Sequence, residues 1–187
     1  MTTTTPAPEA TLDDATLVGR SRDGDVRAYE QLVLRYQGAM FRLAAKMLAD
    51  RAEAEDVTQE VFLKAWRVIG RLQDDAAFVG WLYRMTTNRC LNVLRARRVP
   101  AEVDPDTTAS PRHTRPEHAT EMSSQMAALT EALQQLTPEQ RACWLLREVH
   151  GRSYDEIAEI VGANSTAVRG RIARARAQLA EVMQPWR

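Results

Sequence analysis

The C-terminal part of the chain carries residue types suited to reading duplex DNA. Arginine recurs at positions 169, 171, 174 and 176, and no acidic residue occurs between Ser165 and Ala180. In a helix of about 3.6 residues per turn, one side of this stretch presents small and polar residues flanked by arginine. Small side chains let a helix approach base edges in the major groove, and arginine reaches the adjacent phosphates; the alternative is a basic, solvated face on a bundle helix. The predicted DNA contacts are Ser165, Thr166, Arg169, Gly170, Arg171, Ala173, Arg174 and Arg176.

Capping signals and a tight turn place this helix in a helix-turn-helix. Residues 137–140 and 153–156 both have the spacing of a capping box, which predicts a helix start at each point. Gly162 is expected to end the second of these helices, and Ser165 to cap a third that runs to about residue 178. A short helix, a tight turn and a second helix form a unit whose second helix fits the DNA major groove. The stripe expected to face the core is Val168, Ile172, Ala175 and Leu179.

Residues 78–98 combine aromatic rings, amides and arginines, again without an acid. An unstacked base offers a π face to an aromatic ring, and an amide can hydrogen-bond its edge. We therefore predict a surface for single-stranded DNA. The alternative keeps Trp81 and Tyr83 in the core and uses the arginines to complement a helix C-terminus. The predicted contacts are Trp81, Tyr83, Arg84, Asn88, Asn92, Arg95, Arg97 and Arg98.

Residues 53–66 are predicted to form a helix with acidic first turns, where the helix dipole favours negative charge. The polar residues Asp56, Gln59, Glu60 and Lys64 point away from the expected core. They form either a dock for a basic partner surface or an ordinary solvated face. The stripe expected to face the core is Val57, Val61, Phe62, Ala65, Trp66 and Ile69.

Composition favours an all-α protein and limits how it binds nucleic acid. Of 187 residues 44% are hydrophobic and only 6% aromatic, and the formal net charge is zero. DNA affinity must therefore come from local patches rather than bulk attraction. Cys90 and Cys143 lack CxxC spacing, so a disulfide or metal site is not indicated, and we expect two buried thiols. No apolar run is long enough to span a bilayer and no secretory leader is evident, which predicts a cytoplasmic protein.

The chain divides into two helical domains. We expect a disordered tail over residues 1–11, a first domain over 12–98, a flexible linker over 99–120 and a second domain over 121–187. The linker is rich in proline and polar residues. A metal-dependent hydrolase using His113, His118 and Glu121 is a remote alternative, because nothing regular holds these residues in place. We predict no cofactor, no metal and no catalytic residue.

Taken together, these segments resemble the extracytoplasmic-function (ECF) group of bacterial sigma-70-type RNA polymerase sigma factors, from about Val26 to Leu179. The resemblance rests on three motifs in order: residues 55–62 with Trp66, residues 81–84 with Asn88 and the arginines at 95–98, and the hairpins from Thr137 to Arg176. The chain departs from the family pattern at Asn92, at residues 164–167 and at Gly170. The fold implied is all-α, with a sigma2-like and a sigma4-like domain joined by the linker.

The resemblance implies a non-enzymatic transcription initiation factor. The first motif would bind the clamp helices of the largest polymerase subunit, the second would recognise and melt the downstream promoter element, and the third would read the upstream element. The implied partners are core RNA polymerase, including its flap, promoter DNA in duplex and single-stranded form, and an anti-sigma factor, with nucleoid association when polymerase is bound. A stand-alone helix-turn-helix regulator is the rival hypothesis. The implied docking residues are Glu55, Asp56, Gln59, Glu60, Phe62 and Trp66.

Overall fold

The protein is described by a computed structural model that places residues 12–98 and 121–184. Within these ranges the chain forms eight α-helices and two short 3₁₀ turns, and no strand, so the predicted all-α class is confirmed. The predicted tail and linker lie outside the described residues. The helices are α1 (Asp14–Arg22), α2 (Val26–Leu48), α3 (Arg51–Val68), α4 (Phe78–Arg98), α5 (Glu121–Gln135), α6 (Pro138–Glu148), α7 (Tyr154–Val161) and α8 (Ser165–Val182), and the 3₁₀ turns η1 (Ile69–Arg71) and η2 (Asp75–Ala77) connect α3 to α4.

Helices α1 to α4 form the N-terminal domain. The side chain of Asp25 accepts hydrogen bonds at the start of α2, and that of Asp50 does the same for α3. Each helix buries an apolar stripe, and Phe78 at the start of α4 is fully buried. Tyr29 donates its hydroxyl to the carbonyl of Phe62 at 2.6 Å, which fixes α2 against α3. These contacts set the orientation of the two helices that carry the predicted docking and single-strand residues.

Helices α5 to α8 form the C-terminal domain, and both predicted capping boxes are present at the starts of α6 and α7. Gly162 adopts φ 64°, a conformation that favours glycine, and ends α7 as predicted. The predicted cap of α8 is wrong. Asn164, rather than Ser165, accepts a hydrogen bond from the backbone N–H of Ala167, because Asn164 is the last residue with extended backbone angles.

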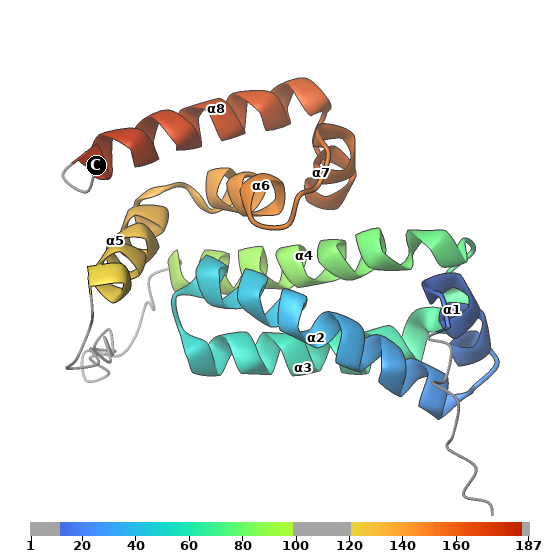
Figure 1. Ribbon diagram of the computed structural model, residues 1–187. Helices are drawn as coiled ribbons and strands as arrows, with labels where there is room; N and C mark the ends of the chain where they lie inside the picture. Colours follow the sequence, from blue (N-terminus) through green and yellow to red (C-terminus); the bar gives the residue numbers. More distant parts are fainter. Residues whose placement is uncertain (1–11, 99–120, 185–187) are drawn as a thin grey trace, which may run out of the picture.

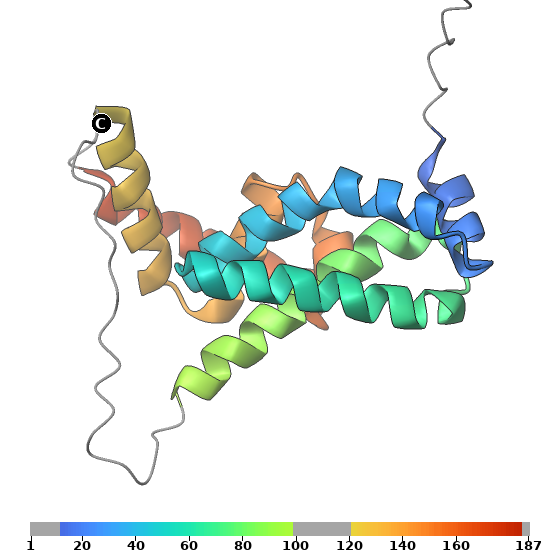
Figure 2. The same cartoon turned by 90° about the horizontal axis from the view of Figure 1, so that it is seen from below.

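The two domains pack against each other along α4. This helix contacts α2 and α3 on one side and α6 and α7 on the other (Figure 1). Helix α8 lies beyond α6 and α7, so these two helices separate it from α4 (Figure 1). Seen from below, the C-terminal end of α4 extends past the α2–α3 pair (Figure 2). The two helices predicted to touch DNA therefore have different surroundings.

Two features of the described residues bear on other kinds of function. No helix in residues 12–98 and 121–184 is long and apolar enough to cross a membrane. In the same ranges, no three His, Cys, Asp or Glu residues gather as a metal site would require. His113 and His118 fall outside the described chain, so their role as ligands stays untested.

Candidate nucleic-acid interfaces

The outer face of α8 has the open, small-residue surface that the sequence predicts. Thr166, Ala173, Arg174 and Ala177 are exposed, and Gly170 is half-buried among them. The predicted core stripe of this helix is buried in full, at Val168, Ile172, Ala175 and Leu179. This burial turns the opposite, polar side of α8 outward, where a DNA groove can reach it.

The arginines of α8 differ in what they contact. The guanidinium of Arg169 lies over the ring of Tyr154, 5.3 Å from its centre. Arg176 donates from Nη2 to Glu148 at 2.5 Å, across to α6. Arg171 is half-buried beside the Cys143 thiol. Three of the four arginines thus brace α8 within its own domain, and Arg174 is exposed on the outer face.

Ser165 lies at the first turn of α8, and its hydroxyl donates to Asp155 of α7 at 2.5 Å. This bond ties the two helices of the predicted helix-turn-helix at their turn. The backbone N–H groups at the start of α8 have no partners further back along the helix, so this end carries a partial positive charge and favours a phosphate. The structure therefore places Ser165 and Thr166 at the end of α8 that major-groove helices present to bases.

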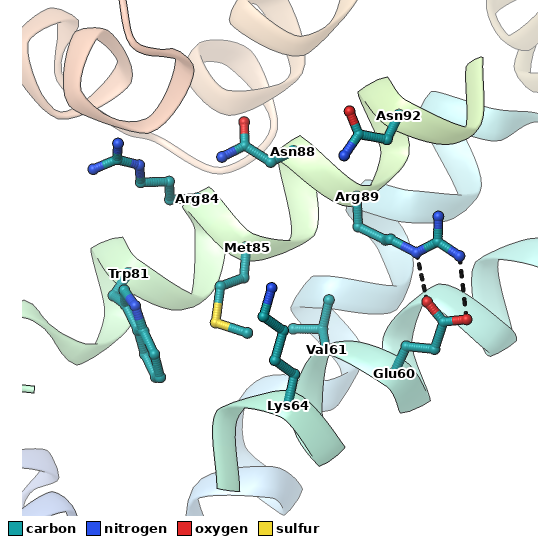
Figure 3. Close-up of a pocket in the computed structure, with 9 residues that line it drawn as sticks. All are labelled: Glu60, Val61, Lys64, Trp81, Arg84, Met85, Asn88, Arg89 and Asn92. Atoms are coloured by element: carbon teal, nitrogen blue, oxygen red, sulfur yellow. Dashed lines mark hydrogen bonds and ion pairs between the residues drawn. The ribbon is translucent and has the colours of Figure 1, made fainter. Parts of the chain in front are cut away.

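A cavity of about 300 Å³ lies between α3 and α4, on the side of α4 away from its partner helix α2 (Figure 3). Figure 3 shows the side chains of Trp81 and Met85 directed toward α3, and Arg84, Asn88 and Asn92 projecting from the other edge of α4. All of these side chains border the cavity, and an aromatic ring, amides and cations together suit an unstacked base and its phosphate. The lining residues are Glu60, Val61, Lys64, Trp81, Arg84, Met85, Asn88, Arg89 and Asn92.

One wall of this cavity is an ion pair between the two helices. Arg89 of α4 donates from Nε and Nη2 to the carboxylate of Glu60 on α3, at 2.5 and 3.2 Å (Figure 3). Hydrogen bonding to Arg89 holds the pKa of the Glu60 carboxyl below its usual value. Glu60, predicted as a docking residue, is therefore already engaged by the neighbouring helix.

Not all of the predicted single-strand residues meet at the cavity. Tyr83 lies on a different side of α4, is only 4% exposed and faces the C-terminal domain. Arg95 hydrogen-bonds Asn92 at 3.0 Å, while Arg97 bonds Glu53 and the carbonyl of Leu48 at the far end of α4. The side chain of Arg98 lies outside the described part of the chain.

The predicted docking residues divide into surface and core. Glu55, Asp56 and Gln59 are exposed on α3, and Glu55 pairs with Arg51 at 3.0 Å. Phe62 is only 7% exposed, so its side chain belongs to the core. The half-buried Trp66 ring packs against Tyr29, with ring centres 4.9 Å apart. The three polar residues are accessible to a partner, and the two aromatic residues hold the helix in place.

Sequence reasoning missed several residues of these surfaces. Met85 and Arg89 line the cavity but were not among the predicted single-strand contacts, and Lys64 lines it although it was expected on the polar face of residues 53–66. Their positions follow the spacing of three and four from Trp81 and Glu60 on their own helices, which is the signal that would have found them. Both cysteines are buried thiols as expected, and burial raises the pKa of Cys90 to about 12.

Comparisons with known proteins match two separate parts of the chain. Residues 32–99 match the Sigma-70 region 2 family, and residues 126–179 match Sigma-70, region 4. The first match contains most of α2, α3 and α4, and the second contains the helix-turn-helix.

Relatives and solved structures of similar sequence cover nearly the whole chain. The RNA polymerase sigma-H factor of Pseudomonas aeruginosa is 37% identical over 185 residues, covering 92% of this chain and 94% of the relative. The ECF RNA polymerase sigma-E factor of Escherichia coli is 35% identical over 184 residues, covering 93% and 96%. The structure of CnrH in complex with the cytosolic domain of CnrY aligns with a TM-score of 0.72 at 26% identity, covering 92% of this chain and 97% of that one. On this similarity of sequence, domain order and fold, the chain belongs to the ECF group of sigma-70-type RNA polymerase sigma factors.

Proposed function

We propose that this sigma factor directs transcription initiation through three surfaces, one for polymerase and two for promoter DNA. The exposed polar face of α3 docks on the clamp helices of core RNA polymerase. The outer face of α8 reads an upstream promoter element in the major groove. The α3–α4 cavity captures bases of the separated strand at the downstream element. These surfaces lie on two domains, for which we propose the boundaries 12–98 and 121–187.

The cavity beside α4 is the observation that carries this proposal. Trp81, Asn88 and Asn92 line a hollow with Arg84 and Lys64, and the acid that also lines it, Glu60, is paired with Arg89. Flipping a base costs a few kcal/mol of stacking, and stacking on an aromatic side chain returns about 1–3 kcal/mol per base. A pocket of this composition therefore offsets a large part of the cost of strand separation.

The face of α3 that docks is narrower than the six residues predicted for it. Glu55, Asp56, Gln59 and Glu60 are exposed, with Glu55 and Glu60 each paired to an arginine, whereas Phe62 is in the core. A neutral chain relies on polymerase for much of its non-specific DNA affinity, because its own basic patches are local. Docking through Asp56 and its neighbours is thus the step that brings α8 and α4 to a promoter.

The proposed role needs binding and no group transfer, so we assign the protein no catalysis. Its place of action is with polymerase on the nucleoid, in the cytoplasm. CnrH is seen with the cytosolic domain of CnrY, and we extend this to a regulatory protein partner, an anti-sigma factor, for the present chain. The stand-alone regulator is not favoured, since members of this family act with polymerase.

Run-off transcription with purified core polymerase tests the proposal on fragments of the source genome. We expect new defined start sites with the protein, and their loss with Asp56→Lys, because a cation replaces the docking carboxylate. Glu30→Lys is the matched control. Glu30 is an exposed acid one turn into α2, as Asp56 is one turn into α3, so both changes oppose the helix dipole equally.

Two results would count against this function. Specific duplex binding without polymerase, and no polymerase-dependent start on any fragment, would favour a stand-alone regulator. Equal loss of starts with Glu30→Lys and Asp56→Lys would show that damage to the fold, rather than to docking, explains the effect.

A further inference from the structure

The connection between α3 and α4 lies at the edge of the α3–α4 cavity. It consists of residues 69–77, which form the two 3₁₀ turns and lead directly into Phe78, the first residue of α4. A further hollow of about 560 Å³ lies between this connection and Trp81, and Lys64 and Trp81 line both hollows. Because Trp81 is only one turn into α4, the position of its ring depends on how the connection is held.

Helix α1 holds this connection from outside. It contacts both 3₁₀ turns and lies beside the start of α4 (Figure 1). Arg22 of α1 donates from Nη1 to Oδ1 of Asp75 in η2 at 2.8 Å, and the two side chains are 34% and 29% exposed. A Cβ added at Gly19 would lie 3.4 Å from Oδ2 of the same carboxylate, so Asp75 lies directly against α1.

The neighbouring acid, Asp74, has a local partner instead. Its side chain accepts a hydrogen bond from the backbone N–H of Ala76 at 2.9 Å and so caps η2. Asp75 is therefore not needed to begin the turn, and its carboxylate is left for Arg22. One acid starts the turn, and the other joins the turn to α1.

Helix α1 can serve as a fixed support because α2 holds it in turn. Leu17 of α1 is fully buried. Asp14 accepts hydrogen bonds from Arg35 and from the hydroxyl of Tyr36, both on α2. Burial, followed by the hydrogen bond to Asp14, raises the pKa of Tyr36 to about 12, so its hydroxyl remains a donor near neutral pH. A displacement of η2 must therefore break its bond to Arg22, since α1 is held elsewhere and does not follow.

From these contacts we propose that Arg22 is a positioning residue for the binding of the promoter strand. It acts through Asp75, which keeps η2 and the first turn of α4 in place. Phe78 carries this restraint onward, because it is fully buried and its ring centre lies 6.1 Å from that of Trp81. The Trp81 ring is then presented to a base in one orientation, so less conformational freedom is lost on binding. The inference rests on the proposed role of the α3–α4 cavity in binding the separated strand.

Strand binding by the polymerase holoenzyme tests this, with the wild type, Arg22→Gln, Asp75→Ala or both changes together. The probe is a fluorescein-labelled single strand of the downstream element, taken from a promoter identified by run-off transcription, and fluorescence anisotropy gives its Kd. Arg20→Gln is the matched control. Arg20 lies on the same helix and loses the same charge, but it pairs with Asp25 in the turn before α2, at 2.6 Å.

We expect Arg22→Gln to weaken strand binding by about two- to fivefold, which is the range that a partly exposed ion pair can contribute. Adding Arg22→Gln to Asp75→Ala should weaken binding no further, because both changes break the same contact. Arg22→Lys, which keeps a cation beside Asp75, should restore most of the affinity. Arg20→Gln should bind the strand as the wild type does. Binding of upstream promoter duplex, measured by mobility shift, should be the same for all of these proteins, since α8 lies in the other domain.

Unchanged strand binding by Arg22→Gln would overturn the inference, as would losses from Arg22→Gln and Asp75→Ala that simply add. An equal loss with Arg20→Gln, or a parallel loss of upstream duplex binding, would overturn it too, because the effect would then be general damage to the protein. Trp81→Ala in the same assay separates this from failure of the proposed function. If Trp81→Ala alone weakens strand binding, only the role of Arg22 is wrong. If Trp81→Ala also leaves strand binding unchanged, the α3–α4 cavity does not bind the strand and both proposals fall.

Discussion

Helices α4 and α8 are alike in the residue types they carry and differ in what packs around them. Over residues 78–98 and 165–180 both are rich in arginine and lack acids. Helix α8 has one outer face, open to solvent and lined by small residues. Helix α4 is contacted from both sides, by Glu53 and Glu60 of α3 and by His150 and Arg152 of the C-terminal domain.

The difference in surroundings matches the kind of DNA that each helix is proposed to bind. A duplex groove is wide and rigid, so a helix that enters it needs an unobstructed convex face with short side chains. A separated strand is flexible, and its bases can be drawn into a cavity between helices. We therefore propose that two arginine-rich helices bind different forms of DNA because of what packs around them.

The largest expected effect is on α8, from Ala173→Asp. Ala173 is exposed in the middle of the outer face, so the new carboxylate would meet the DNA backbone or base edges. Like charges brought together in an interface cost several kcal/mol, and we expect a loss of about 3 kcal/mol in binding to upstream promoter duplex. Electrophoretic mobility shift with the polymerase holoenzyme measures it, on promoter fragments identified by run-off transcription.

Ala180→Asp is the control for that change. Ala180 is exposed on nearly the same side of α8 but two turns further along, away from the helix start that major-groove helices present to bases. A similar loss with Ala180→Asp would mean that added negative charge anywhere on α8 weakens binding. The outer face would then have no special role, and the contrast with α4 would disappear.

A smaller effect is expected on α4, from Trp81→Ala. Removing the ring takes away the stacking surface of the α3–α4 cavity, which is worth about 1–3 kcal/mol per base. We expect weaker binding to single-stranded downstream promoter DNA and slower open-complex formation, with upstream duplex binding unchanged. Trp81→Phe keeps an aromatic face and should retain most of the affinity. Equal losses with Phe and Ala would show that Trp81 acts through packing rather than by stacking on a base.

The sequence predicted the local features of this fold well because they depend on near neighbours. The capping boxes at Thr137 and Ser153 and the glycine that ends α7 are set by side chains within a few residues of one another. The error at Asn164 is of the same local kind. Ser165 is as good a capping residue as Asn164 by type, and only the backbone angles decide which of them is the last residue before the helix.

The surroundings of the predicted site residues could not be predicted from the sequence, because they depend on distant parts of the chain. Tyr83 is buried by His150 and Arg152, nearly 70 residues later, and no periodicity within α4 indicates that contact. Glu60 reads as a solvated acid until α4 is placed beside α3 and brings Arg89 to it. Helical spacing says which residues share a face, and tertiary packing decides what that face meets.

The smallest expected effect concerns the Glu60–Arg89 ion pair, which joins α3 to α4. Both side chains are about half exposed, at 52% and 42%, so the pair is worth about 0–1 kcal/mol of stability. Glu60→Gln should lower the free energy of unfolding by no more than this, as measured by urea denaturation, and the loss should shrink as salt is added.

The same ion pair should make stability depend on pH. Because Arg89 lowers the pKa of Glu60, the pair contributes its full stability above the ordinary glutamate pKa, and this stability is lost as pH falls through the lowered pKa of Glu60. A charge swap, Glu60→Arg with Arg89→Glu, should restore the coupling in a double-mutant cycle. A swap that restores nothing, or a loss that is insensitive to salt, would mean that α3 and α4 are joined by their apolar stripes alone, and the cavity would then keep its shape without the ion pair.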